Sequence, residues 1–172
     1  MKKLTLPLTK EQIKELHAGD SVLLTGVILT ARDCAHKRIF EYLDGGKELP
    51  FPLKDAAIYY AGPCPAKPGK ASGSCGPTTS ARMDSFAPRL YDLGLGCAIG
   101  KGEMCEEVRQ ALMRNTCCYF AAIGGAGALY GNAVQDSRCI AFPDLLSEAV
   151  HRLEVVDFPV VVAMDCYGKT IY

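Results

Sequence analysis

The sequence predicts an α/β fold with a mixed central sheet. Three observations lead to this prediction. Apolar runs of strand length alternate with amphipathic runs of helix length through the middle of the chain, clusters of glycine and proline separate them, and strand-like runs lie near both termini. A chain of 172 residues can bury a full hydrophobic core, and we expect one domain over residues 1–172 without an internal repeat.

The N-terminal part is expected to contain three strands and two helices. Thr9-Lys-Glu-Gln12 has the form of a capping box, which favours a helix start at this point. Ser21–Thr30 is rich in leucine and β-branched residues, which is typical of a buried strand. The elements expected here are a strand at 2–8, a helix from Thr9 to Leu16, strand 21–30, a helix at 32–43 that ends at Asp44-Gly-Gly46, and a strand at 56–60.

Residues 61–77 are dense in glycine, proline and serine, which excludes regular structure. A loop of this length inside a compact domain is usually functional or disordered. The alternative is a linker between two domains, although neither flank is long enough for a comfortable independent domain.

The C-terminal part is expected to alternate helices and strands and to finish in β-structure. Pro88 is expected to bend or break the first of these helices. The elements expected in order are a helix at 78–93, a strand at 95–99, a helix at 103–114, a strand at 117–123, a glycine-rich bend at 124–131, strands at 153–156 and 160–164, a turn at 167–168 and a last short strand at 171–172.

Composition limits the partners of this chain. Nineteen basic and nineteen acidic residues give a formal net charge of zero, so no general attraction to nucleic acid or to a membrane surface is expected. The N-terminus lacks the continuous apolar stretch of a signal peptide, and no apolar run is long enough to cross a bilayer. We therefore expect a cytoplasmic protein.

The nine cysteines are not spaced like metal ligands. They include no C-x-x-C pair and no cluster with histidine, so no metal site made by this chain alone is expected. In a reducing compartment we expect free thiols, many of them serving as small buried apolar residues.

The strongest local pattern is Gly73-Ser-Cys-Gly-Pro-Thr-Thr-Ser-Ala-Arg82. A glycine-rich loop that leads into a helix presents unpaired N–H groups to an anion. If Thr78 and Arg82 lie on one helix, their side chains share a face, and the guanidinium could grip a carboxylate through two parallel hydrogen bonds. The alternative is an ordinary capped helix in which Arg82 pairs with an acidic neighbour such as Asp84.

Two further cations follow predicted strands. Arg32 stands near a helix N-terminus, where a cation is electrostatically unfavourable, although the adjacent Asp33 could neutralise it. Lys101 lies between two glycines after an apolar strand, and its alternative interpretation is an ordinary surface lysine. Ligands of α/β proteins gather at the carboxyl ends of strands, so the three cations together favour a small anionic substrate.

Three other features are weaker. Gly124-Gly-Ala-Gly127 lacks the Gly-Lys-Ser/Thr of a phosphate-binding loop and is interpreted as a turn that permits close packing. Cys75 could be a nucleophile, but no histidine is near it in sequence. His36 is better explained as a structural histidine than as a catalytic one.

At these residues the sequence resembles the β subunit of class I fumarate hydratases, which is similar to that of L(+)-tartrate dehydratases and to the C-terminal part of single-chain class I fumarases. The resemblance runs nearly end to end. The motifs that carry it are Thr30-Ala-Arg-Asp-Cys-Ala-His-Lys-Arg38, Tyr60-Ala-Gly-Pro63, Gly76-Pro-Thr-Thr-Ser-Ala-Arg-Met-Asp84, Ile99-Gly-Lys-Gly102, Tyr119-Phe-Ala-Ala-Ile-Gly-Gly125 and Leu153-Glu-Val-Val-Asp-Phe-Pro159.

The resemblance implies a swivelling β/β/α domain and a partner α subunit that carries a 4Fe–4S cluster, with no metal bound by this chain. By motif position, Arg32, Arg82 and Lys101 resemble the residues that hold a dicarboxylate substrate. Thr78 matches a threonine proposed to transfer a proton at the carbon next to the carboxylate. Thr78, Arg82 and Lys101 are accordingly the expected catalytic residues, and assembly as a homodimer or as α2β2 is compatible with this family.

The function expected from this resemblance is reversible hydration of fumarate to (S)-malate, carried out with the α subunit. One alternative is the β subunit of L(+)-tartrate dehydratase, which differs by one substrate hydroxyl. Another class of alternative is a non-catalytic dicarboxylate-binding or assembly module, in which Arg82 and Lys101 would be dispensable.

Overall fold

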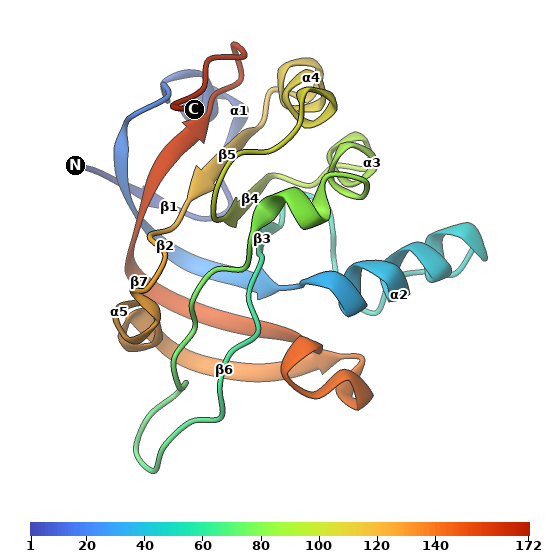
Figure 1. The fold of residues 1–172 in the computed structure, drawn as a ribbon, viewed down its shortest axis with the longest axis vertical. Coiled ribbons are helices and arrows are strands. Elements are labelled where there is room, and N and C mark those ends of the chain that lie inside the picture. The colour runs from blue at the N-terminus through green and yellow to red at the C-terminus, as the bar shows by residue number, and fades with distance from the viewer.

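A computed structural model describes residues 1–172. It contains seven strands, five α-helices and two 3₁₀ helices (Figure 1). In chain order these are β1 (Lys2–Thr5), α1 (Lys10–Lys14), β2 (Ser21–Thr30), α2 (Asp33–Asp44), β3 (Ala57–Tyr59), η1 (Ser80–Met83), α3 (Ala87–Asp92), β4 (Cys97–Gly100), α4 (Glu106–Asn115), β5 (Cys118–Ala121), α5 (Gly127–Ala133), β6 (Val134–Ala141), η2 (Pro143–Glu148) and β7 (Val150–Met164).

All seven strands belong to one sheet with the order β1-β2-β3-β4-β5-β7-β6. The neighbours from β1 to β5 run parallel, whereas β7 is antiparallel to β2, β5 and β6. Because β2 also pairs with β7, the strands β2, β3, β4, β5 and β7 form a closed circuit, with β1 and β6 alongside it. The predicted α/β fold with a mixed sheet is confirmed, and the closure is a feature that the sequence pattern did not indicate.

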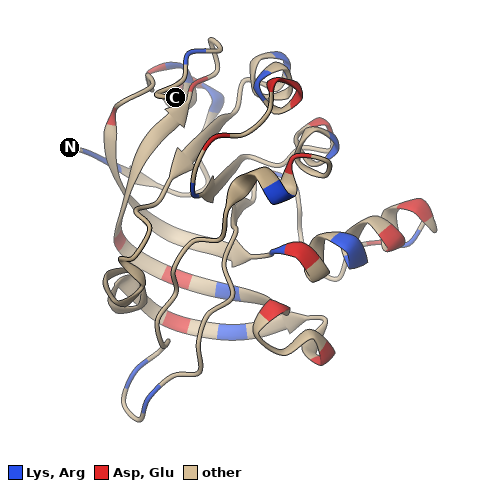
Figure 2. Cartoon of the chain, in the orientation of Figure 1, with Lys and Arg blue, Asp and Glu red and all other residues tan.

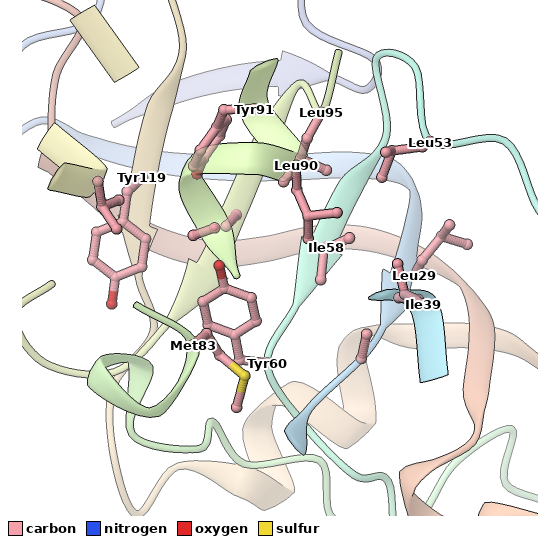
Figure 3. Packing of buried hydrophobic residues seen from close by; sticks show 14 of the residues in the cluster. Leu29, Ile39, Leu53, Ile58, Tyr60, Met83, Leu90, Tyr91, Leu95 and Tyr119 are labelled. Carbon is pink, nitrogen blue, oxygen red and sulfur yellow. The ribbon is translucent and has the colours of Figure 1, made fainter. Parts of the chain in front are cut away.

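Alternate residues of the strands pack on the two faces of this closed sheet, as the two-residue repeat of a strand requires. In β4, Cys97 and Ile99 belong to one buried cluster and Ala98 to the other. One cluster packs against α2, α3 and α4, which lie along one side of the sheet (Figure 1). Its aromatic members include Tyr119 and Tyr60, whose ring is drawn beside Met83 (Figure 3).

Several local predictions are confirmed. Strand β2 has the predicted bounds, and α2 differs from its predicted range by a single residue at each end. The capping box at Thr9 forms both of its hydrogen bonds. Residues 61–77 contain neither helix nor strand. None of the helices combines the length and the apolar character that crossing a bilayer requires.

The helix predicted over 78–93 is broken near Pro88, as expected, but the break lies at residues 84–86 and the part before it is only a short 3₁₀ helix. The structure has η1 and α3 instead, and Pro88 stands in the first turn of α3, where its missing N–H costs no helical hydrogen bond. Thr78 lies before η1 in extended chain, so Thr78 and Arg82 do not share a helix face.

The predicted glycine-rich bend at 124–131 is also partly wrong, because α5 begins at Gly127. Its glycines are required by close packing on the long loop. A Cβ on Gly127 would collide with Ser74 Oγ, and one on Gly131 would collide with Gly73 O. A helix tolerates such glycines when another segment must approach closely.

The last part of the sheet differs from prediction in two ways. Strand β6 (Val134–Ala141) was not predicted, because four consecutive residues at its centre, 135–138, are polar and the strand is half-exposed at a sheet edge. Strand β7 is continuous where two strands were expected, since a bulge between Val155 and Phe158 accommodates Asp157 at φ 51°. The expected last strand at 171–172 is reduced to an isolated bridge between Met164 and Thr170.

Candidate functional site

The candidate site lies at the carboxyl ends of the parallel strands β2, β3 and β4. The segment before η1 crosses these ends and extends the sheet locally. Thr78 N donates to Tyr60 O at 2.7 Å, and Thr79 forms a parallel bridge with Lys101. The chain thereby brings the residues that follow three separate strands to one edge, as expected for ligand sites of α/β folds.

Arg32 is the N-cap residue of α2 and makes no side-chain cap. Its Nε lies 3.3 Å from Asp33 Oδ2 and 3.2 Å from Glu148 Oε1, at the end of η2. Its stem lies close to Gly62, where an added Cβ would approach Cδ of Arg32 to 3.4 Å. Two carboxylates therefore neutralise the cation at this helix N-terminus.

Arg82 reaches the same carboxylate from η1. Its Nε donates to Asp33 Oδ1 at 2.8 Å, and its side chain is 51% exposed. Asp33 thus joins Arg32 and Arg82, one oxygen to each (the Arg32–Arg82 pair). Burial opposes ionisation of Asp33, but its own backbone N–H and the guanidinium of Arg82 outweigh burial and lower its pKa.

Every contact that fixes the Arg32–Arg82 pair uses Nε. The contacts of Arg32 with Asp33 and Glu148, and that of Arg82 with Asp33, leave the terminal Nη atoms of both guanidiniums without a protein partner. A guanidinium offers two Nη groups that can bind a carboxylate through parallel hydrogen bonds. Both arginines are therefore oriented on one side and open on the other.

Lys101 follows β4 and is exposed, and its ammonium makes no ion pair. Its stem runs past the turn after β5, where a Cβ on Gly124 would lie 3.0 Å from Cδ of Lys101. The structure brings Lys101 beside Thr79 through the backbone and brings Arg32 and Arg82 together through Asp33. No direct contact joins the Lys101 side chain to either arginine.

Two details of the predicted anion loop are wrong. Several of its N–H groups are not free, since Cys75 N donates to Gly127 O, Thr78 N to Tyr60 O and Ser80 N to Lys101 O, whereas the N–H groups of Gly76 and Thr79 have no protein partner. The partner of Arg82 is Asp33 rather than Asp84, whose carboxylate instead accepts from Cys105 N at 3.1 Å. The side-chain cations and the N–H groups of Gly76 and Thr79 are therefore the groups here that stay available to an anion.

His36 is fully buried beneath the Arg32–Arg82 pair. Its Nδ1 lies 3.0 Å from Arg32 O, and its Nε2 has no protein partner. Burial lowers the pKa of His36 to about 4, so the ring is neutral near pH 7. This agrees with the structural interpretation of His36.

The thiols of this chain do not fit an iron–sulfur site. Nowhere in the chain do three His, Cys, Asp or Glu side chains gather as metal ligands. Five of the nine cysteines are buried among apolar residues. Burial raises the pKa of the Cys75 thiol to about 12, which argues against an activated nucleophile at this position.

Charges of both signs are interspersed over the surface, as Figure 2 shows along α2, β6 and β7. The sequence singled out the cations of the candidate site and Asp33 beside Arg32, but not the other groups that orient them. Glu148 lies 116 residues beyond Arg32, and Tyr119, which bonds next to Lys101, resembles an ordinary core residue of a strand. No local pattern distinguishes these two residues.

The chain matches a known protein family. The whole chain, residues 1–172, matches the family described as "Fumarase C-terminus". It is 38% identical over 165 residues to "Fumarate hydratase 2" of Leishmania major and 37% identical over 163 residues to "Fumarate hydratase class I, anaerobic" of Escherichia coli. These matches cover 95% and 94% of the chain but only 29% and 30% of those two proteins.

A relative of similar size is also found. The chain is 42% identical over 171 residues to a Methanocaldococcus jannaschii protein named "Putative L(+)-tartrate dehydratase subunit beta". This match covers 96% of the chain and 88% of the relative. The chain therefore corresponds in extent to a subunit named beta and to less than a third of the two fumarate hydratases.

Proposed function

The chain belongs to the Fumarase C-terminus family, and from this premise we propose that it is the β subunit of a two-subunit fumarate hydratase. It acts as one domain, and its α subunit carries the 4Fe–4S cluster, because the thiols of this chain do not fit one. The complex, an α2β2 assembly, interconverts fumarate and (S)-malate.

The observation that carries this proposal is the orientation of the Arg32–Arg82 pair. A dicarboxylate has two anionic ends and needs a cation at each. The open Nη atoms of Arg82 and Arg32 receive one carboxylate while their Nε atoms stay on Asp33 and Glu148. Lys101, which has no ion pair, receives the other carboxylate as a point charge.

In this arrangement the β subunit orients the substrate. Fixed guanidiniums hold the reacting carbon atoms in one place, which lowers the entropy cost of reaching the transition state. The Thr78 side chain makes no hydrogen bond to the protein and is free to exchange a proton at the carbon next to the carboxylate. The half-exposed Arg82 becomes enclosed when the α subunit covers this edge, which strengthens its hold on charge.

Replacement of Arg82 by Ala in the assembled complex tests this proposal. The loss of one preorganised charge-stabilising donor is expected to lower kcat/KM by about 10²–10³-fold. Arg82→Lys is expected to restore little, since an ammonium cannot form the bidentate contact. Arg114→Ala is the matched control, because Arg114 on α4 is similarly exposed (48%) and pairs with Asp92, the last residue of α3, rather than with a residue of the site.

Circular dichroism and co-purification with the α subunit establish that each variant folds and assembles. If the Arg82→Ala complex assembles and turns over at the parent rate, the carboxylate-binding role of Arg82 is refuted. That result would favour the alternative function, a non-catalytic assembly module. Lys101→Ala is expected to behave like Arg82→Ala, with non-additive effects if both residues hold one substrate.

A second candidate substrate is L(+)-tartrate, favoured by the 42% identity and matching length of the tartrate dehydratase relative. The two acids differ by one hydroxyl, and a site that hydrogen-bonds that hydroxyl discriminates strongly against the acid that lacks it. Steady-state rates of the complex on (S)-malate and L(+)-tartrate decide between them. Faster turnover of tartrate would make this chain a tartrate dehydratase subunit.

A further inference from the structure

Two buried hydroxyl groups lie directly beneath the candidate site. Ser80 is the first residue of η1, and Tyr119 is on β5, and both residues are 0% exposed. Ser80 Oγ and Tyr119 Oη are 2.8 Å apart (the hydroxyl pair). A buried polar pair needs further partners to offset its desolvation, and here the partners belong to one short stretch of backbone.

That stretch is Lys101-Gly102. Ser80 N donates to Lys101 O at 2.8 Å, and Lys101 N donates to Ser80 Oγ at 2.8 Å. Tyr119 OH lies 2.8 Å from Gly102 O. Three hydrogen bonds from two different elements therefore fix the backbone on both sides of the Lys101 side chain.

The acceptors determine where the protons lie. A carbonyl oxygen can only accept, so the Tyr119 proton points to Gly102 O. The Ser80 proton then points to Tyr119 Oη, and Ser80 Oγ accepts from the Lys101 amide. Every hydroxyl proton and the amide proton are used, and a fully connected buried network of this kind rigidifies what it holds.

The hydroxyl pair is closely packed against the backbone of β4. A Cβ on Gly100 would collide with Ser80 Oγ and would lie 2.8 Å from Cδ2 of Tyr60. The Ser80 hydroxyl therefore occupies the space that a side chain at residue 100 would fill. This close packing at Gly100 restricts the position of the backbone of Lys101, the next residue.

Lys101 needs such an anchor more than the arginines do. Asp33 and Glu148 orient the Arg32–Arg82 pair through side-chain contacts, whereas no carboxylate pairs with the Lys101 ammonium. Apart from the contact of its stem with Gly124, the direction of this side chain is set by its backbone.

We propose that Ser80 and Tyr119 are positioning residues that hold Lys101 in register with the Arg32–Arg82 pair. The inference rests on the proposed function, because it assumes that Lys101 binds one carboxylate of the substrate. It adds two residues that touch neither substrate nor cofactor and that act through the Lys101 backbone.

The first measurement needs no turnover. Amide hydrogen exchange of Lys101 and Ser80 is compared between the parent protein and Tyr119→Phe, Ser80→Ala and Tyr91→Phe. Loss of the hydroxyl pair is expected to lower protection of the Lys101 amide by about tenfold, the equivalent of one hydrogen bond of about 1.4 kcal/mol. Tyr91→Phe is the matched control, since Tyr91 is equally buried in the same cluster and its hydroxyl lies 3.5 Å from Cys118 O, away from Lys101. Unchanged protection in both Tyr119→Phe and Ser80→Ala would overturn the proposal.

The second measurement is steady-state kinetics of the assembled complex. Tyr119→Phe and Ser80→Ala are each expected to lower kcat/KM by about tenfold, mostly through KM, because the carboxylate that Lys101 holds is bound before and during reaction. The double variant is expected to lose little more than either single one, because the two hydroxyls act as one chain. A merely structural role would reduce the amount of active enzyme and leave KM unchanged, and that result would refute a positioning role.

Lys101→Ala separates this inference from the proposed function. If Lys101→Ala is impaired while Tyr119→Phe and Ser80→Ala keep the parent KM, the positioning role is wrong and the proposed function survives. If Lys101→Ala itself keeps the parent kinetics, the proposed role of Lys101 fails, and the positioning role fails with it.

Discussion

Replacement of Gly100 by Ala tests the packing beneath the candidate site. The new methyl group would collide with Ser80 Oγ and press on the ring of Tyr60, and both neighbours are fully buried. Overpacking of this kind costs about 1–3 kcal/mol. Displacement of Ser80 also loses its hydrogen bond from Lys101 N, worth about 1 kcal/mol.

Together these terms predict that Gly100→Ala lowers the free energy of unfolding by about 2–4 kcal/mol. For a chain of this size the midpoint of thermal unfolding is expected to fall by about 5–15 °C. Urea unfolding of the purified chain, followed by circular dichroism, measures the change, provided that the m-value stays constant. Gly76→Ala is the control, because a Cβ there would find its nearest neighbour at 3.7 Å.

A second variant makes the test specific. In Gly100→Ala combined with Ser80→Ala the colliding oxygen is gone, and the remaining approaches are 2.8 Å to Tyr60 Cδ2 and 3.2 Å to the Cβ of residue 80. The double variant should therefore be more stable than the sum of the two single effects predicts, by about 1 kcal/mol or more. Strict additivity, or a Gly100→Ala protein within about 0.5 kcal/mol of the parent, would refute the close approach of Ser80 to Gly100.

Three further predictions follow from buried groups. Tyr60→Phe should raise the free energy of unfolding by about 1 kcal/mol, because the Tyr60 hydroxyl is buried without a protein partner; a loss in urea unfolding would mean that the hydroxyl is satisfied. His36 takes up its proton in the unfolded chain near pH 6.5 but in the folded chain only near 4, so stability should fall by up to about 3 kcal/mol as pH drops through that window; His36→Asn should flatten this dependence of the thermal midpoint on pH, and an unchanged dependence would contradict the burial of a neutral ring. The purified chain, supplied with iron and sulfide, should hold no stoichiometric 4Fe–4S cluster by absorbance and iron analysis, because its thiols are dispersed; a cluster that is lost on replacing a few cysteines would contradict the placement on the α subunit.

The elements predicted well from the sequence are those whose formation is determined by residues within the element itself. The capping box at Thr9 and the leucine-rich run of β2 carry their own signals, and both form where predicted. Strand β6 escaped prediction because its polar residues lie at a sheet edge and gain their place from pairing with β7. The helix α5 was not predicted because it contains glycines, which disfavour a helix. These glycines are needed because the loop at residues 61–77 packs closely on α5.

In the candidate site too, residues with a local sequence signal could be predicted, whereas contacts between distant residues could not. Arg32, Arg82 and Lys101 could be singled out because each is a cation near the carboxyl end of a predicted strand or in a glycine-rich loop. Asp33 could be named as the neighbour that neutralises Arg32, but the contact of Arg82 with Asp33 spans 49 residues and that of Ser80 with Tyr119 spans 39, and neither could be predicted. Hydrogen bonds over such separations depend on the tertiary fold, which no local window of sequence contains.

The pairing of β2 with β7 has a consequence for how the molecule is made. Residues 21–29 pair with residues 152–161, so the longest ladder of the sheet joins segments about 130 positions apart. On a ribosome, β2 can pair with β1 and β3 early, but its long ladder with β7, and the contact of Arg32 with Glu148, must wait until the last part of the chain is synthesised. Chains whose contacts are so distant fold slowly and expose unpaired strand edges meanwhile. A stalled chain that ends before residue 150 would therefore present the β7-facing edge of β2 as an open edge for aggregation.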